Sequence, residues 1–333
     1  MPEIRIDPLS GHRTIVAGER SRRPGGAPTL SESERVLEPI DPERDPFAEG
    51  HEDRTPPEIY AVRPGSDAPD SPGWRVRVVP NLYPALAPAG AEEGGAAEDG
   101  AGELFRSLPA TGVHEVIVNA PQPVLSLADL PVEQVAGAMD VWRQRMRTHE
   151  RCAYVQLIVN ERRQAGASLP HTHAQLYGLQ FVPAAVARER ERAAEYATRT
   201  MGQSLLGDLV AEEVRLRERN VAIDDEAVLM APYASRLPFQ LMLAPRRPVP
   251  RFEQDGPLGA SLLHDGLRHL ARHLGASPPL NLWVRTAPRG VEHFAWRIDV
   301  VPRLTHLAGL ELSTDLNLNI VAPEHAAALL REA

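Results

Sequence analysis

Two histidines and a glutamine, His171, His173 and Gln175, stand at every second position in the segment GASLPHTHAQLYGLQFVP, residues 166–183. Side chains alternate between the two faces of a β-strand, so this spacing places all three on one face. The apolar, β-prone residues that follow favour a strand here. Three polar groups converging on one face need a partner, which is a metal, a phosphate or another group of the protein.

A metal and a phosphate make different demands on this motif. A zinc site needs three or four ligands, and no Cys, Asp or Glu at similar spacing completes the set nearby. A neutral imidazole can instead attack phosphorus and form a covalent intermediate, while a glutamine amide donates to a phosphate oxygen. The small residues Gly166, Ala167 and Ser168 let backbone N–H groups approach an anion. Together these features favour phosphate chemistry over ordinary core or surface histidines.

The composition restricts the class of protein. The 333 residues suffice for one large domain or two ordinary ones, and 43% apolar with 24% charged residues is typical of a soluble globular chain. A net charge of −9 argues against a broad basic surface for nucleic acid or membrane. No apolar run approaches about 20 residues, and no signal-peptide pattern opens the chain. The single cysteine, Cys152, lies in an apolar segment and is expected in the core. We expect a cytoplasmic protein.

Two series of expected elements follow one another in the same order. In the first, strands at 112–121 and 152–160 flank a helix over 127–151 that Asp129 caps, and the motif strand comes next. Residues 184–219 predict one long helix or two. The second series contains strands, a helix and two more strands, at 226–245, 258–275, 280–288 and 294–304. The repeated order predicts an internal duplication of an α+β unit, with a boundary between residues 190 and 220. The low-complexity segment 87–103 predicts a surface loop.

The segment ASLPHTHAQLYG resembles the histidine motif of galactose-1-phosphate uridylyltransferases, a family of the histidine-triad superfamily with the consensus N-P-H-P-H-G-Q. Six further segments resemble that family in its own order: EIRIDPLSGHRTIVAGERSRRP, DPFAEGHEDRTPPEIY, RVRVVPNLYPAL, GVHEVIVNAP, APYASRLPFQ and VVPRLTHLAGLELSTDLNLNIVAPEHAAALLR. The resemblance covers nearly the whole chain. It implies an α+β fold of two fused histidine-triad-like repeats, each an antiparallel sheet with flanking helices, at residues 1–195 and 196–333.

The resemblance also implies roles for single residues. His173 matches the nucleophile that takes the nucleotidyl group from a nucleotide sugar, Gln175 matches a residue that hydrogen-bonds the transferred phosphate, and His171 matches a zinc ligand. Five positions match residues that contact the nucleotide and its phosphates: Arg20, Asn81, Asn160, Gly166 and Ser168. Gly309 and Glu311 match a segment that contacts the hexose, often across a dimer interface, so a homodimer is implied.

The zinc site of the family departs from its pattern in this chain. Two cysteine positions and one histidine position of the zinc-binding members are occupied by Asp45, Ala48 and Pro123. Only His171 of the four ligands is kept, and a structural zinc requires four. We therefore expect no metal cofactor at this place.

A second metal site of some members is altered as well. Its glutamate is kept as Glu189, but its three histidine positions are Arg285, Ala295 and Arg297. Two permanent cations beside a carboxylate can replace the charge of a metal ion. We predict that Arg285 and Arg297 pair with Glu189, and also with Asp299; the alternative is that these arginines face solvent.

The activity that the resemblance implies is the transfer of a UMP group between a nucleotide sugar and a hexose 1-phosphate through a nucleotidyl-His173. Leu310 stands where the family has a sugar-binding tyrosine, which removes a hydroxyl from the acceptor pocket. This change favours two alternatives: an ADP-glucose-type phosphorylase that uses inorganic phosphate, or a hydrolase. A catalytically idle nucleotide-binding protein is the alternative of a different class, and retention of His173 and Gln175 speaks against it. The sequence does not choose between uracil and adenine.

Overall fold

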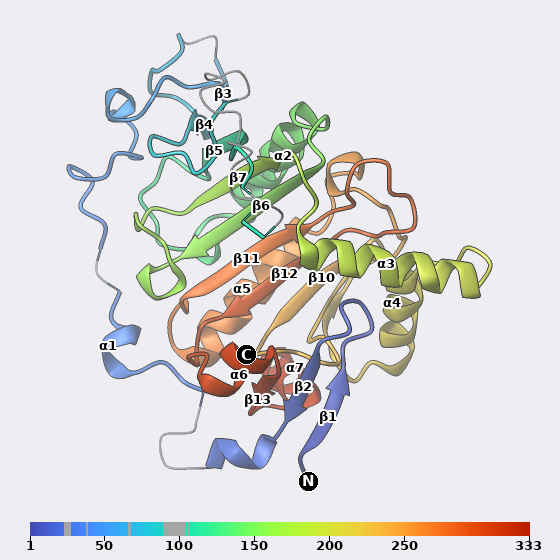
Figure 1. Ribbon diagram of the computed structural model, residues 1–333. Coiled ribbons are helices and arrows are strands. Elements are labelled where there is room, and N and C mark those ends of the chain that lie inside the picture. Colours follow the sequence, from blue (N-terminus) through green and yellow to red (C-terminus); the bar gives the residue numbers. More distant parts are fainter. Residues whose placement is uncertain (23–27, 38, 66–67, 89–103, 106) are drawn as a thin grey trace.

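The computed structural model describes residues 1–22, 28–37, 39–65, 68–88, 104–105 and 107–333. Most of the segment for which a surface loop was predicted, residues 87–103, lies outside these residues. A three-stranded sheet joins the two ends of the chain (Figure 1). Its strands are β1 (Glu3–Ile6), β2 (Arg13–Val16) and β13 (Asn317–Asn319).

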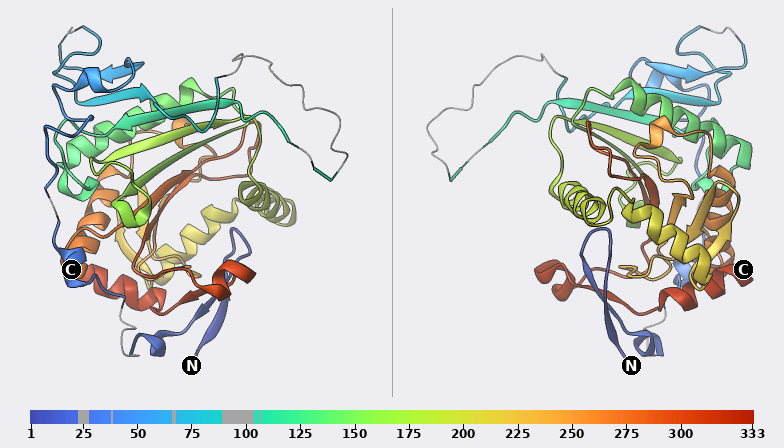
Figure 2. Two further views of the ribbon diagram at one scale, coloured as in Figure 1. Left: turned by 60° about the vertical axis from the view of Figure 1, so that its left-hand side comes forward. Right: turned by 90° about the vertical axis from the view of Figure 1, so that its right-hand side faces the viewer.

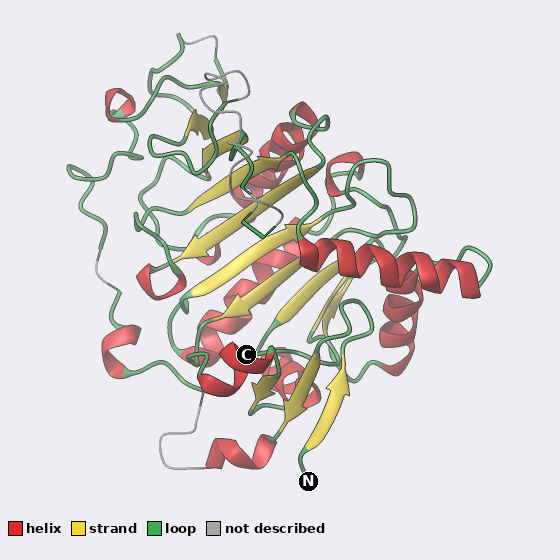
Figure 3. Ribbon diagram, viewed as in Figure 1, coloured by secondary structure: helices red, strands yellow, loops and turns green. Residues whose placement is uncertain are grey.

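The main body is a ten-stranded sheet in which every neighbouring pair is antiparallel (Figure 3). The first half of the chain contributes β3 (Tyr60–Val62), β4 (Val76–Pro80), β5 (Gly112–Val118), β6 (Tyr154–Glu161) and β7 (His173–Leu179). The second half contributes β8 (Asn220–Ile223), β9 (Ala227–Met230), β10 (Leu241–Pro245), β11 (Leu280–Arg285) and β12 (Arg297–Pro302).

The α-helices are α1 (Glu32–Arg35), α2 (Val132–Thr148), α3 (Ala184–Arg199), α4 (Leu205–Leu216), α5 (Ala260–Leu274), α6 (Gly309–Thr314) and α7 (Pro323–Glu332). Short 3₁₀ helices are η1 (Gly18–Arg22), η2 (Glu52–Arg54), η3 (Leu127–Asp129), η4 (Arg163–Ala165) and η5 (Phe252–Gln254).

The two halves of the sheet have the same strand order. Counted from the outer edge, the first half is β3-β4-β5-β7-β6 and the second is β8-β9-β10-β12-β11. They meet where β6 pairs with β11, with Asn160 opposite Asn281, and the helices α2 and α5 occupy equivalent places in the chain. The predicted α+β class is confirmed. The strand order agrees with the predicted duplication, and the division at residues 195 and 196, which falls within α3, stays a prediction.

Each face of the sheet has its own covering. Trp142 of α2 and Leu267 of α5 lie in one buried core with Leu176 of β7 and Val300 of β12. Figure 2 shows these two helices on one side of the sheet and α3 and α4 on the other. Because alternate residues of a strand face opposite sides, the histidine motif is left on the face away from α2 and α5.

One local alternative is decided and one local expectation is wrong. The region 184–219 forms two helices, separated where Met201 and Gly202 adopt φ angles of 57° and 102°, and Ser204 caps the second helix. Asp129 does not cap α2: it ends η3, and Pro131 occupies the N-cap position. The predicted core position of Cys152 is confirmed. Within the described ranges, none of the helices combines the length and the apolar character needed to cross a membrane.

A buried carboxyl group fastens the start of η3 to the sheet. Glu161, the last residue of β6, is fully buried, and it accepts hydrogen bonds from Ser126 Oγ at 2.6 Å and from the N–H of Leu127 at 2.7 Å. Burial raises the pKa of Glu161 to about 7, which these hydrogen bonds lower only in part. The folded protein therefore keeps this proton at a pH where the unfolded chain has lost it.

This raised pKa predicts a pH-dependent stability. Between the unfolded pKa and about pH 7, only the unfolded state releases the proton of Glu161, so the free energy of unfolding should fall as pH rises, by about 3 kcal/mol in total. Glu161→Gln should flatten this dependence in urea unfolding between pH 5 and 8. The control Glu191→Gln, at an exposed carboxylate, should keep the wild-type slope, and equal slopes in all three proteins would contradict the prediction.

Candidate active site

His173, the first residue of β7, is held in one tautomer. Its Nδ1 lies 2.7 Å from the carbonyl oxygen of His171, and a carbonyl can only accept, so Nδ1 carries the hydrogen and Nε2 carries the lone pair. Burial lowers the pKa of His173 below its ordinary value, and the hydrogen bond to the carbonyl of His171 offsets this effect only in part. The ring is therefore neutral near pH 7 and has a nucleophilic nitrogen.

His171 is held at both ring nitrogens. Its Nε2 donates to the carbonyl of Ala120 at 2.8 Å, and its Nδ1 lies 2.6 Å from Asp45 Oδ2. The carboxylate also accepts the N–H of Phe47 at 3.0 Å, and the Phe47 ring packs edge-on against His173 with centroids 5.2 Å apart. This buried pair fixes the backbone carbonyl that sets the tautomer of His173.

The residues present do not fit the zinc of the family. Asp45 and His171 bond to each other, while Ala48 and Pro123 have no side chain that could bind a metal. Across the part of the chain that the structure describes, no three His, Cys, Asp or Glu side chains gather as a metal site would require.

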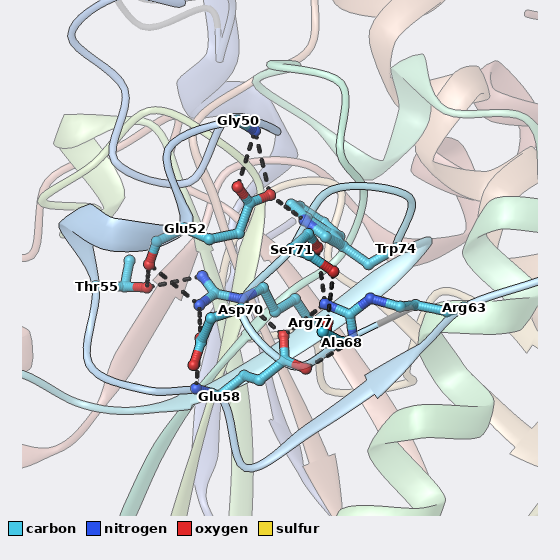
Figure 4. A network of polar contacts seen from close by, with 10 residues as sticks. All are labelled: Gly50, Glu52, Thr55, Glu58, Arg63, Ala68, Asp70, Ser71, Trp74 and Arg77. Carbon is cyan, nitrogen blue, oxygen red and sulfur yellow. Dashed lines mark hydrogen bonds and ion pairs between the residues drawn. The ribbon is translucent and has the colours of Figure 1, made fainter. Parts of the chain in front are cut away.

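A network of ion pairs braces the segment that follows Asp45 (Figure 4). Arg77 of β4 is 2% exposed; its guanidinium donates to Glu58 at 3.1 Å, to Asp70 at 2.5 Å and to Thr55 Oγ1 at 2.7 Å. Arg63 binds both carboxylate oxygens of Glu58, at 2.6 and 2.8 Å. The segment is thereby fastened to the sheet beside the histidine motif.

Gln175 lies two residues beyond His173 on the same face of β7, and its side chain is half-buried. Its Oε1 accepts the hydroxyl of Tyr177 at 2.8 Å and contacts His114 Nε2 at 3.0 Å. Asn81 Nδ2 lies 3.1 Å from the same His114 nitrogen. Strand pairing thus brings together the predicted residues Gln175 and Asn81. The sequence analysis missed His114 and Tyr177, although strand alternation places both on this face.

Strand β6 and the loop that follows it supply three more predicted residues. Asn160 Oδ1 accepts the side-chain amide of Asn281 at 2.8 Å, and this amide also donates to the carbonyl of Ala165 at 2.7 Å. The carbonyl oxygen of Asn160 is therefore occupied, and its NH₂ group is the part left for a ligand. Gly166, with a φ of 91°, ends η4, and Ser168 follows it; both are exposed.

Three predicted residues are not brought to the motif within one chain. Arg20 is exposed in η1, which Figures 1 and 2 show beside the N-terminal hairpin at the far end of the molecule from β7. Gly309 and Glu311 lie in the short helix α6, where Glu311 accepts the N–H of Ala308 at 2.9 Å. Their roles stay predictions.

The predicted pairing of Arg285 and Arg297 with Glu189 is confirmed. Glu189 of α3 lies 3.0 Å from Arg297 and 3.5 Å from Arg285, and Arg297 also bonds Asp299 at 3.0 Å. Burial alone would raise the pKa of Glu189, but the two guanidinium groups hold it below its ordinary value. The arginines do not face solvent, since the Arg297 side chain is only 7% exposed.

Two family models match this chain. The family model described as galactose-1-phosphate uridyl transferase, N-terminal domain, matches residues 1–183. The chain belongs to the galactose-1-phosphate uridyl transferase family. A second model, a domain of unknown function (DUF4921), matches residues 132–332.

Relatives with different names are similar over nearly the whole chain. An ADP-glucose phosphorylase of Arabidopsis thaliana is 28% identical over 99% of this chain and 93% of its own length. A galactose-1-phosphate uridylyltransferase of Cryptococcus neoformans is 27% identical over 98% of this chain and 89% of its own. The crystal structure of an Arabidopsis thaliana ADP-glucose phosphorylase with bound ADP-glucose superposes with a TM-score of 0.80 at 25% identity, covering 100% of this chain and 99% of that one.

A structure of a uridylyltransferase has a TM-score of 0.74 at 24% identity, and it covers 100% of this chain and 98% of its own. This second likeness shows a shared fold. The two curated relatives have different names, and these similarities do not separate the two named activities.

The ion pairs of Glu189 predict a large stability effect. Arg297→Met leaves the carboxylate of Asp299 without its partner and that of Glu189 with one cation instead of two. Because both carboxylates are buried, the free energy of unfolding should fall by about 3–5 kcal/mol. The matched control is Arg215→Met, which breaks an exposed pair with Glu212 and should change stability too little to measure. Urea unfolding measures the stability of both variants, and an unchanged stability of Arg297→Met would contradict the prediction.

The pairing of His171 with Asp45 predicts independence from metals. Dialysis against a strong chelator should leave the thermal midpoint unchanged, because protein groups already occupy both ring nitrogens of His171. Elemental analysis of the purified protein should find far less than one zinc per chain. One tightly held zinc per chain, with a lower midpoint after its removal, would refute this reading.

Proposed function

We propose that this protein is a nucleotidyltransferase that takes a nucleoside monophosphate group from a nucleotide sugar onto Nε2 of His173. The observation that carries the proposal is the hydrogen bond from His173 Nδ1 to the carbonyl of His171 at 2.7 Å. It leaves a neutral imidazole with its lone pair on the other nitrogen, which is the form that attacks phosphorus.

The first step forms a bond between His173 Nε2 and the α-phosphorus. The bond from that phosphorus to the bridging oxygen breaks, and the sugar 1-phosphate leaves with the electron pair. The imidazole now bears a positive charge, and its Nδ1–H donates a stronger, charge-assisted hydrogen bond to the His171 carbonyl. The NH₂ groups of Gln175, Asn81 and Asn160 are suited to the phosphate oxygens. In the second step an acceptor attacks phosphorus and breaks the bond to Nε2.

Two acceptors fit the second step. A hexose 1-phosphate with a uridylyl intermediate is the assignment that the resemblance of the motif implies. Inorganic phosphate with an adenylyl intermediate is favoured by the similarity to a protein named ADP-glucose phosphorylase over 99% of this chain. Leu310, 41% exposed in α6, has no hydroxyl for a sugar and is consistent with the second acceptor.

The proposed partners are a nucleotide sugar and a sugar 1-phosphate or phosphate, in a cytoplasmic homodimer. Arg20 and Glu311 lie apart from His173 within one chain. A second copy of the chain would have to bring them to the site if they contact the substrate.

The covalent intermediate can be tested directly. We expect intact-protein mass spectrometry, after brief incubation with UDP-glucose or ADP-glucose, to show one added nucleoside monophosphate on the wild type and none on His173→Ala. The mass of the adduct names the base. Absence of an adduct from either donor, with nucleotide binding still detectable, would refute the proposal in favour of an idle nucleotide-binding protein.

The isolated adduct then identifies the acceptor. Discharge by galactose 1-phosphate, with release of the nucleotide sugar, would identify a uridylyltransferase-like enzyme. Discharge by inorganic phosphate, with release of a nucleoside diphosphate, would identify a phosphorylase. Loss of the adduct in buffer at the same rate as with either acceptor would identify a hydrolase.

A further inference from the structure

We propose that His114 and Tyr177 are positioning residues that hold the Gln175 amide with its NH₂ group toward the phosphate. The inference rests on the proposed function, because it names how one group of that site is oriented. The two rings stack across paired strands, with centroids 4.1 Å apart and an angle of 26° between their planes. Neither residue itself supplies a group to the reacting phosphorus.

The backbone determines the tautomer of His114. The N–H of Ala85 donates to His114 Nδ1 at 3.0 Å, so Nδ1 is the acceptor and Nε2 carries the hydrogen of the neutral ring. Burial lowers the pKa of His114, which keeps the ring neutral near pH 7. The group at 3.0 Å from Nε2 must then be an acceptor, and it is Gln175 Oε1.

This tautomer excludes the flipped amide of Gln175. After rotation by half a turn, the Nε2–H of His114 would face two NH₂ groups, that of Gln175 and that of Asn81 at 3.1 Å, and would lose its acceptor. A tyrosine hydroxyl can donate or accept, so Tyr177 is compatible with either orientation of the Gln175 amide. His114 determines which orientation is adopted. The hydroxyl of Tyr177 then donates its own hydrogen to the same Oε1 at 2.8 Å.

A second amide is turned the same way. Asn81 Oδ1 accepts the N–H of Tyr83 at 2.8 Å, so its NH₂ group faces His114, with Nδ2 3.1 Å from Nε2. Both nitrogens are donors and cannot bond to each other. Among the described residues, none accepts a hydrogen bond from Gln175 Nε2. The NH₂ groups of Gln175 and Asn81 are therefore left without an acceptor in the part of the chain that the structure describes, and a phosphate oxygen would satisfy them.

The test measures the rate of nucleotidyl-His173 formation in a single turnover with each nucleotide sugar. His114→Phe keeps a ring that stacks on Tyr177 but removes the Nε2–H that donates to Gln175. The side-chain amide of Gln175 is then free to rotate and must be immobilised when the substrate binds. We therefore expect the rate to fall by about 3- to 10-fold. Tyr177→Phe should reduce the rate less, because His114 still determines the orientation of the Gln175 amide. The matched control Tyr154→Phe removes a hydroxyl that donates to Gln156 at 3.3 Å, and it should leave the rate unchanged.

A double-mutant cycle separates positioning from general damage to the fold. In the Gln175→Ala background, His114→Phe and Tyr177→Phe should change the rate by less than about 2-fold, because the amide through which they act is absent. Equal losses in both backgrounds would overturn the proposal, as would no loss in the wild-type background.

A readout without turnover keeps this test distinct from that of the proposed function. In protein labelled with nitrogen-15 on glutamine, the side-chain signals of Gln175 should shift when AMP or UMP is added. That shift should shrink in His114→Phe and remain in Tyr154→Phe. If the wild type forms no adduct but this pattern holds, the proposed function fails and the positioning stands. If the wild type forms the adduct and the shift is the same in all variants, the positioning fails alone.

Discussion

The burial of one face of the ten-stranded sheet by α2 and α5 is the constraint on which the rest of the molecule depends. Trp142 and Leu267 bring these helices against alternate residues of the central strands, and this contact determines which face of each strand is buried. In β7 it commits Leu176 to the core, so that His173 and Gln175 face the other way. The same alternation in β12 places Arg297 and Asp299 on the face opposite Val300. The packing of α2 and α5 on the sheet thus determines the face that carries the candidate active site and the face that carries the ion pairs of the second half.

Backbone groups then decide the protonation pattern of the site. The carbonyl of His171 selects the tautomer of His173, and the N–H of Ala85 selects that of His114. A backbone group is a donor or an acceptor and cannot exchange roles, so each contact removes one tautomer from consideration. The orientation of the imidazoles consequently needs no metal.

Pairs of polar side chains occupy both places where the family pattern has a metal. Asp45 and His171 form a buried pair beside the motif, and Arg77 with its carboxylates braces the segment that carries Asp45. In the other half, Arg285 and Arg297 surround Glu189. Buried charges are tolerated when they are paired and hydrogen-bonded, and the removal of one partner is then costly. Metal coordination and ion pairs thus satisfy the same demand, which is to compensate charge inside the fold.

The family pattern indicated the pairing of Glu189 with two arginines, and the position of His171, which precedes β7, was left to the tertiary structure. The sequence by itself determined the α+β class and the shared face of His173 and Gln175. These follow from periodicity and residue type, which are local properties. Only the tertiary structure decided that Asp45 reaches His171 and that His114 reaches Gln175, contacts that span 126 and 61 residues. It also decided that Pro131, and not Asp129, precedes α2. Partners so far apart in the chain are chosen by strand order and register, and no pattern within a single segment contains that information.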